Sequence, residues 1–328
     1  MTSSAHSVTV LMPVHNAEKH LAEAVESILN QTFSDFELLC VDDGSTDTSP
    51  EILARYAGKD DRIRIIRNEK NNGIALSLNR GLKEAHTDLI ARMDSDDASL
   101  PTRLALQVAF MAANPDVLIS SGGMALYETD MCISLPTDDA TIRIHLLWKS
   151  PFCHPAVIFR RTPVLEAGGY DTAAIPAEDY ELWTRLAAAR GWRFANLDTV
   201  LLRYRTHPGL KRDGYLAAQR EKVLAIAENH LLQLGLAGTE LDRDAHAVFT
   251  GFGVPETLPG DRLHNWRETL IRNNKEQGVF EPKLFAKVCR ERMYTVAVNA
   301  KCIPLWAKTL ISSGIKQTVK KILFAYNR

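Results

Sequence analysis

Two clusters of acidic residues, each following a short apolar run, are the part of this sequence best suited to chemistry. The first, Asp-Asp-Gly-Ser-Thr-Asp at residues 42–47, follows the run 36–41, and the second, Asp-Ser-Asp-Asp at residues 94–97, follows the run 89–93. Both runs predict strands, so each cluster lies at the sheet edge where α/β proteins bind ligands. Carboxylates gathered there repel one another unless a cation relieves them. The pattern predicts a divalent metal that holds a phosphate-rich ligand.

Alternating apolar runs and amphipathic segments position these clusters. Strands are predicted at residues 8–12, 36–41, 62–67, 89–93 and 156–159, with helices after Asn16, Ser49, Gly73, Leu100 and Ala177. This order is typical of βαβ units and predicts an α/β fold with a mostly parallel sheet and flanking helices. Residues 120–155 are less periodic and are expected to wrap the site. Only helices are predicted in the C-terminal third, so we expect two domains, residues 1–210 and a helical extension at 211–328.

Composition and charge narrow the class of protein. The chain has 328 residues, of which 45% are hydrophobic, and a formal net charge of −1. That charge creates no global field for nucleic acid, so we expect no nucleic-acid partner. The five cysteines are scattered without a CxxC motif, which favours reduced thiols in a cytoplasmic protein. No uncharged stretch reaches the about eighteen residues of a membrane-spanning helix, and the N-terminus lacks the features of a signal peptide.

Six motifs in order make the sequence similar to a known family. They are Val-Thr-Val-Leu-Met-Pro-Val-His-Asn at residues 8–16, Gln-Thr-Phe at 31–33, the two acidic clusters, Asn-Gly at 72–73 and Glu-Asp at 178–179. In this order the chain resembles the family 2 inverting glycosyltransferases of the GT-A fold, over residues 8–207. The resemblance implies a metal-dependent enzyme that moves a sugar from a nucleotide-diphosphate sugar, by default a UDP-sugar. The hydroxyl acceptor would be a saccharide or lipid-linked saccharide in bacterial surface polysaccharide or glycolipid assembly.

The resemblance also implies residues for the donor side. Asp43 would accept hydrogen bonds from the nucleobase, and the imidazole of His15 would pack on the base, where related enzymes often carry an aromatic residue. Asp94 would contact the ribose, Asp96 would bind Mn²⁺ or Mg²⁺, and Asp97 would support the site. The donor-binding positions are Pro13, His15, Asp43, Asn72, Asp94, Asp96 and Asp97, and the metal ligands are Asp96 and His207. The Asn-Gly pair at residues 72–73 is equally explained as a turn.

Asp179 occupies the family's catalytic-base position. In a single displacement with inversion, a positioned carboxylate removes the proton of the acceptor hydroxyl as the new bond forms. His154, Glu178 and Trp183 are the candidates for the acceptor side. Acidic residues at 178 and 179 also suit the first turn of a helix without any catalytic role.

Two other functions stay open. A sugar-phosphate nucleotidyltransferase shares the need for a nucleotide and a metal, but normally carries a glycine-rich basic loop after the first strand, where this chain has Pro-Val-His-Asn at residues 13–16. A noncatalytic binding module would keep the fold without turnover.

The C-terminal stretch 301–328 contains basic residues and no acidic residue, interleaved with apolar ones. This pattern is that of a basic amphipathic helix, which would contact the inner face of the cell membrane peripherally. The alternative is a core-packing helix with a solvated basic face.

Overall fold

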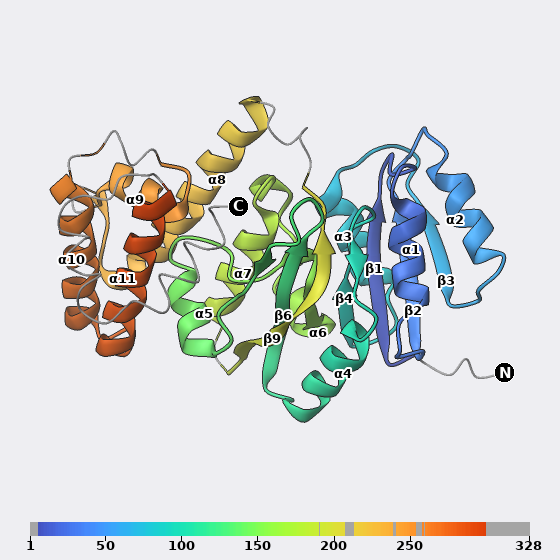
Figure 1. Ribbon diagram of the computed structural model, residues 1–328, viewed down its shortest axis with the longest axis horizontal. Coiled ribbons are helices and arrows are strands. Elements are labelled where there is room, and N and C mark those ends of the chain that lie inside the picture. Colours follow the sequence, from blue (N-terminus) through green and yellow to red (C-terminus); the bar gives the residue numbers. More distant parts are fainter. Residues whose placement is uncertain are drawn as a thin grey trace. The chain divides into compact units, whose positions relative to one another are not determined.

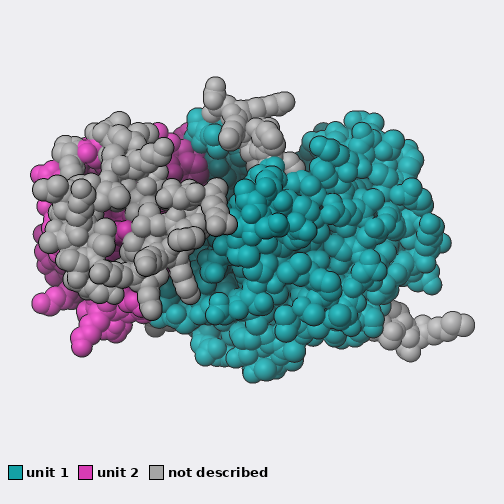
Figure 2. Space-filling view, viewed as in Figure 1, with its two compact units in different colours: residues 1–143, 150–219 teal, residues 144–149, 220–328 magenta. Residues whose placement is uncertain are grey.

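The computed structural model describes residues 6–189, 191–206, 213–238, 241–253, 258 and 260–299. The chain divides into two compact units, residues 1–143 with 150–219, and residues 144–149 with 220–328 (Figure 2). That residues 1–210 and 211–328 form two separate domains stays a prediction. In the part of the chain that is described, no helix combines the length and the apolar character needed to cross a membrane. His207 and the basic stretch 301–328 lie outside the described residues.

The first unit is built on one mixed sheet of nine strands (Figure 1). The strand order is β3-β2-β1-β4-β8-β6-β9-β5, and β7 pairs with β6. The strands are β1 (Val8–Val14), β2 (Phe36–Asp42), β3 (Ile63–Arg67), β4 (Leu89–Arg92), β5 (Ala98–Ser99), β6 (Val117–Leu126), β7 (Cys132–Ile133), β8 (Ile158–Arg160) and β9 (Arg193–Tyr204).

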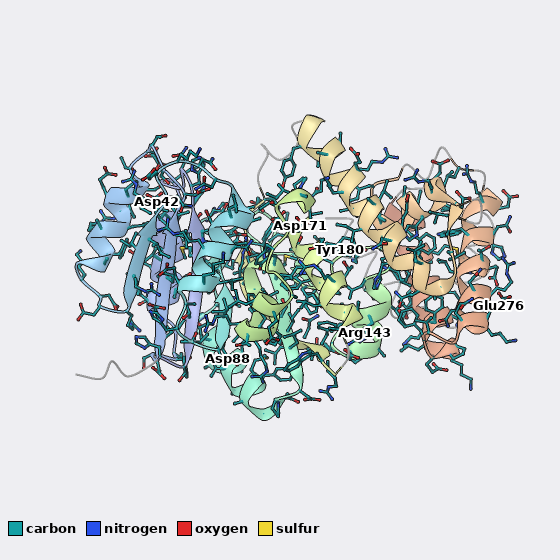
Figure 3. All side chains as sticks on the ribbon, turned by 180° about the vertical axis from the view of Figure 1, so that it is seen from behind. Asp42, Asp88, Arg143, Asp171, Tyr180 and Glu276 are labelled. Carbon is teal, nitrogen blue, oxygen red and sulfur yellow. The ribbon has the colours of Figure 1, made fainter. Side chains whose placement is uncertain are left out.

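The four strands β1 to β4 are parallel, so their C-terminal ends meet at the same edge of the sheet. The register pairs Val8 of β1 with Phe36 of β2 on one side and with Leu89 of β4 on the other. Figure 3 shows the consequence: Asp42 at the end of β2 and Asp88 just before β4 lie at opposite edges of the sheet. Both acidic clusters therefore follow strands that end at one edge, as the sequence predicts.

Helices cover the sheet because their apolar residues recur at helical spacing. In the first unit they are α1 (Leu21–Leu29), α2 (Ser49–Ala57), α3 (Ile74–Glu84), α4 (Arg103–Ala113), α6 (Arg161–Glu166) and α7 (Glu178–Ala188), while α5 (Asp139–His145) leads into the second unit. Helix α3 approaches β1 closely: a Cβ on Gly81 would lie 2.2 Å from Leu11 Cδ1. The expected α/β fold with flanking helices is confirmed.

Two long strands, β6 and β9, are missing from the sequence-based prediction. They pair in parallel along most of their length. The expectation of irregular structure from residue 120 is wrong for residues 120–126, because the small residues that suggest a loop instead allow close packing. A Cβ on Gly122 would lie 2.6 Å from Leu201 Cδ1, so β6 accommodates the side chain of its neighbour only with glycine at that position.

The second unit is helical, as expected. Its helices are most of α8 (Asp213–Leu231), then α9 (Arg243–Thr250), α10 (Gly260–Gln277) and α11 (Pro282–Asn299). Phe249, Trp266 and Phe285 are buried in its own apolar cluster. The segment 144–149 groups with this unit because Trp148 is buried in the same cluster.

Candidate active site

Asp43, directly after β2, lies in a cradle of N–H donors. Its Oδ1 accepts from Asn68 Nδ2 at 2.6 Å and from the Asn72 backbone N–H at 3.0 Å, and its Oδ2 accepts from the Gly73 backbone N–H at 2.8 Å. Burial opposes ionisation, but these donors outweigh it and lower the pKa of Asp43 below its usual value. The Ser77 hydroxyl is a further donor to this carboxylate, which is thus held as an ionised group that only accepts hydrogen bonds.

Gly44 allows this cradle to form. It has φ +66°, and a Cβ there would lie 2.6 Å from the backbone carbon of Lys70. We expect Gly44→Ala to lower the free energy of unfolding by about 1–3 kcal/mol, the cost of a strained backbone position, as measured by denaturant unfolding. Gly58→Ala is the control, because Gly58 has φ −72° and a Cβ there meets its nearest atom at 3.4 Å. Equal stability of the two variants would contradict this explanation.

His15, after β1, is oriented by its neighbours. Its Nδ1 lies 2.9 Å from the Asp43 carbonyl oxygen and its Nε2 lies 2.9 Å from Asn71 Nδ2. A carbonyl only accepts and an amide nitrogen only donates, so Nδ1 carries the proton and Nε2 accepts. The ring is exposed beside Asp43, while Pro13 is partly buried within β1 and the Asn72 side chain is exposed. The structure thus brings His15, Asp43 and Asn72 together.

Asn16 caps no helix; it adopts φ 49° and accepts a hydrogen bond from the Thr46 N–H at 2.8 Å.

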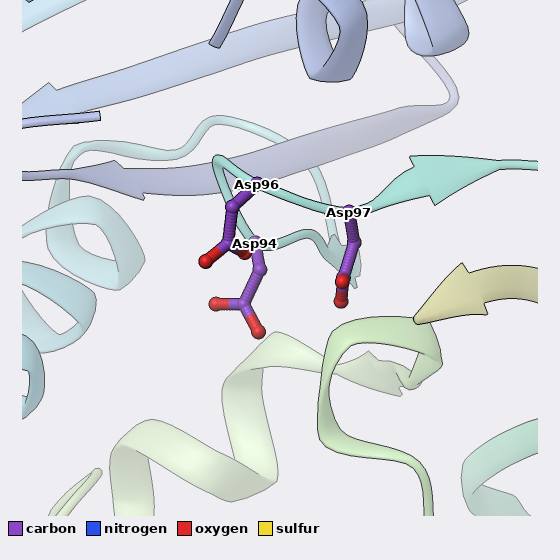
Figure 4. Close-up of side chains that lie close together, drawn as sticks. All are labelled: Asp94, Asp96 and Asp97. Carbon is purple, nitrogen blue, oxygen red and sulfur yellow. The ribbon is translucent and has the colours of Figure 1, made fainter. Parts of the chain in front are cut away.

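The acidic triplet Asp94, Asp96 and Asp97 follows β4. One carboxylate oxygen of each lies within 4.8 Å of the others, and Figure 4 shows the three side chains pointing to the same side of the loop. Asp94 Oδ1 pairs with Arg92 Nη2 at 2.5 Å. Asp97 Oδ1 accepts from the Arg205 N–H at 2.8 Å, whereas its Oδ2 is buried and has no partner among the described residues.

These residues fit the metal ion that the resemblance implies. Burial, and next the negative charge of Asp94, raise the pKa of Asp97 to about 8. A hard divalent cation prefers carboxylate oxygens and would offset this repulsion. The buried Asp97 Oδ2 without a partner is the observation that favours a cation here. The other expected ligand, His207, lies outside the described residues.

Arg92, at the end of β4, is a site residue that the motif analysis misses. It is 2% exposed and pairs with Asp94, and its Nε and Nη1 find no partner within the described part of the chain. Its positive charge lowers the pKa values of Glu178 and Asp179, against larger effects of burial. Arg92 is therefore paired with the acidic triplet, and its charge also acts on the proposed base. The available signal was a charged residue inside the apolar run 89–93.

Asp179 and Glu178 begin helix α7. Burial raises the pKa of Asp179 above its usual value and outweighs the opposing effects of the Tyr180 N–H and Arg92. Burial, and next the charge of Asp179, raise the pKa of Glu178 to about 7. Two neighbouring carboxylates with raised pKa values are suited to accepting a proton near neutral pH.

The expected acceptor-side residues His154 and Trp183 belong to an aromatic cluster through which Trp183, a residue of α7, packs against the body of the first unit. Trp183 is fully buried, and its ring centroid lies 6.0 Å from that of His154 and 6.4 Å from that of Tyr170. The Tyr170 hydroxyl lies 3.0 Å from His154 Nε2, and burial holds the pKa of His154 well below its usual value. In this structure the Trp183 ring supports α7 and does not face solvent.

Tyr215 at the start of α8 is a second residue absent from the sequence-based set. It is 40% exposed, and its pKa is raised by burial and then by the charges of Glu178 and Asp179. The first turns of α8 are tied to the segment before α7 by a hydrogen bond from Gln219 Nε2 to the Pro176 carbonyl oxygen at 3.3 Å. An exposed aromatic ring therefore lies near the proposed base, and no sequence motif marks it.

Comparison with known sequences identifies the family. Residues 9–167 match the model of Glycosyl transferase family 2. EpsE of Bacillus subtilis (strain 168), which is named as a glycosyltransferase, is 34% identical over 282 residues, or 83% of this chain and 99% of that protein. The O-antigen biosynthesis glycosyltransferase WbnJ of Escherichia coli is 34% identical over 205 residues, or 61% of this chain and 80% of that protein.

Solved structures share the fold. S. aureus TarS 1–349 in complex with UDP has a TM-score of 0.56 at 20% identity, covering 90% of this chain and 91% of that chain. The mannosyltransferase PcManGT from Pyrobaculum calidifontis, in complex with GDP-Man and Mn²⁺, has a TM-score of 0.53 at 19% identity, covering 98% and 86%. The GT-A fold is thereby confirmed, and with the sequence relatives it leads to one conclusion: this chain is an enzyme that belongs to glycosyltransferase family 2.

Proposed function

We propose that this enzyme transfers a sugar from a UDP-sugar to a hydroxyl of a saccharide or lipid-linked saccharide, with inversion and with a divalent metal ion. The observation that carries the proposal is the acidic triplet, whose carboxylate oxygens lie within 4.8 Å of one another beside the buried Arg92, the charge of which also acts on Asp179. UDP in the TarS structure and GDP-Man with Mn²⁺ in the PcManGT structure support a nucleotide-sugar donor and a metal. The name of WbnJ supports a role in surface-polysaccharide assembly.

Donor binding is assigned to the shared edge of β1, β2 and β4. The ionised Asp43 carboxylate would accept a hydrogen bond from a base N–H, and the His15 ring would pack on the base. Asp94, held by Arg92, would contact the ribose, and Pro13 and Asn72 would line the donor site. Mn²⁺ or Mg²⁺ held by Asp96, with Asp97 in support and His207 as a further ligand, would neutralise the diphosphate as the sugar–phosphate bond breaks.

The transfer step needs one carboxylate from the protein. The acceptor oxygen attacks the anomeric carbon opposite the diphosphate, the bond to the phosphate oxygen breaks, and its electron pair leaves with the diphosphate. Asp179 takes the proton of the acceptor hydroxyl. Burial makes Asp179 a stronger base than an exposed aspartate, and Arg92 helps to keep it ionised at neutral pH.

The acceptor side is assigned to Tyr215 and Glu178, next to Asp179. Tyr215 offers an exposed aromatic face to the apolar side of a sugar ring, and Trp183 of α7 packs against His154. We keep a cytoplasmic location, and contact of residues 301–328 with the inner face of the membrane, as proposals. Liposome sedimentation with and without those residues tests the membrane contact, and equal sedimentation of the two forms would remove it.

Donor hydrolysis tests the reaction type, because water replaces the unidentified acceptor. The enzyme is incubated with a panel of α-linked UDP-sugars, with Mn²⁺ or with chelator, and the released sugar is identified by proton NMR before mutarotation mixes the anomers. We expect release that depends on Mn²⁺ and gives the β-anomer. The α-anomer would contradict inversion, and sugar 1-phosphate in place of free sugar would indicate nucleotidyltransferase-type attack at phosphorus.

A further inference from the structure

The loop that carries the acidic triplet is held by Arg205, which follows β9. The Arg205 backbone N–H donates to Asp97 Oδ1 at 2.8 Å, and its Nε donates to the Asp96 carbonyl oxygen at 2.9 Å. Arg205 therefore contacts Asp97 through its backbone N–H and Asp96 through its side chain. The position of both aspartates depends on where Arg205 lies.

Arg205 is itself fixed by two residues from distant elements. Its Nη2 donates to Glu23 Oε2 of α1 at 2.7 Å, and its guanidinium carbon lies 4.0 Å from the centroid of the Tyr127 ring, just after β6. The Tyr127 hydroxyl in turn donates to Glu23 Oε1 at 2.6 Å. Each of the three side chains thus contacts the other two. Only 18% of the Arg205 side chain is exposed, so these contacts determine its orientation.

The neighbouring Arg203 provides an internal comparison. Its guanidinium lies on the same Tyr127 ring, 4.5 Å from the centroid, and its Nη2 pairs with Asp130 at 3.1 Å. Its side chain is 42% exposed, and among the described residues it makes no hydrogen bond or ion pair with the triplet loop. Arg203 and Arg205 therefore share the Tyr127 ring, but of these two arginines only Arg205 contacts the acidic triplet.

We propose that Arg205 is a positioning residue for metal binding, an inference that rests on the proposed function. Asp94, Asp96 and Asp97 repel one another, so a loop without a brace would separate them before a cation arrives. Arg205 fixes the backbone at Asp96 and one oxygen of Asp97, and Glu23 and Tyr127 fix Arg205. Contacts of this kind, behind the ligands, hold the ligand oxygens in place, and their loss typically weakens metal binding about 10–100-fold.

Calorimetric titration of the full chain with Mn²⁺, at saturating UDP, tests the proposal. Arg205→Lys keeps the charge but loses the planar guanidinium, whereas Arg203→Lys makes the same change beside the same ring. We expect Arg205→Lys to weaken Mn²⁺ binding about tenfold, and Arg203→Lys to change it by no more than about twofold, as for ordinary surface substitutions. Glu23→Gln and Tyr127→Phe remove single contacts behind Arg205, and should weaken Mn²⁺ binding in the same direction by less.

The outcomes separate the possible errors. Equal Mn²⁺ affinity of Arg205→Lys and wild type would overturn the positioning role, and so would equal losses in the two arginine variants. If Arg205→Lys does not fold, Glu23→Gln, which alters one half-exposed carboxylate, decides instead. Weaker UDP binding by Arg205→Lys even at Mn²⁺ concentrations that saturate both proteins would mean that Arg205 contacts the nucleotide directly, and would overturn the proposal. Wild type that binds UDP but no Mn²⁺ would overturn the proposed metal dependence itself, together with this inference.

Discussion

The Asp179→Asn variant is expected to transfer sugar at least about a hundredfold more slowly than wild type, while binding the donor normally. The amide keeps the size of the side chain but cannot take the proton of the acceptor hydroxyl. Donor affinity should not change, because Asp43 and the triplet, which we assign to the nucleotide, follow other elements. Turnover and donor affinity are measured separately, by product formation and by calorimetry with UDP.

Glu178→Gln is the control for this prediction, since it makes the same chemical change one residue earlier in α7. Glu178 is assigned to the acceptor side and not to the proton transfer, so this variant should lose much less turnover than Asp179→Asn. The active base is the ionised form, and burial raises the pKa of Asp179, so the rate should fall as the pH drops through that raised value. An inactive Glu178→Gln with a nearly normal Asp179→Asn would make Glu178 the base.

The second large effect is expected for Asp96→Asn. A bound metal contributes several kcal/mol to the stabilisation of the departing diphosphate, and about 1.4 kcal/mol corresponds to a tenfold change in rate. We therefore expect turnover at a fixed, moderate Mn²⁺ concentration to fall at least about a hundredfold, and to recover in part when Mn²⁺ is raised. Turnover is measured across a series of Mn²⁺ concentrations for both proteins.

Asp88→Asn is the control for Asp96→Asn. Asp88 precedes β4 at the opposite edge of the sheet, so the same change there should leave the dependence on Mn²⁺ as in wild type (Figure 3). An Asp96→Asn variant with the metal dependence of wild type would show that the triplet does not hold the ion.

The sequence predicts the site best where chemistry and strand ends coincide. Asp43 and the triplet could be predicted as site residues because both follow apolar runs that read as strands. The C-terminal ends of parallel strands meet at one edge of the sheet, where α/β proteins bind ligands. The two backbone donors to Asp43, the N–H groups of Asn72 and Gly73, could not be predicted, because they depend on the close approach of residues 70–73 to Gly44. Such contacts between distant segments leave no periodic signal.

Arg92, Arg205 and Tyr215 show what local patterns leave out. Arg92 lies in a run that reads as an ordinary strand, and only its burial beside Asp94 shows its importance. Arg205 is held by Glu23 and Tyr127, which are far apart in the sequence. Tyr215 comes near Asp179 because α8 is tied to Pro176. Each depends on pairing or packing between elements, as β6 and β9 do, and single-sequence periodicity does not carry that information.

Thermal unfolding with UDP, GDP and dTDP, each with and without Mn²⁺, tests the donor site most directly. A ligand at a hundred times its dissociation constant adds about 2.7 kcal/mol of stability, which is a clear shift in Tm. We expect UDP to raise the Tm of wild type only when Mn²⁺ is present, and to raise that of Asp96→Asn little or not at all. A shift with GDP or dTDP alone would change the donor class. No shift with any nucleotide would contradict a metal-dependent nucleotide-sugar site.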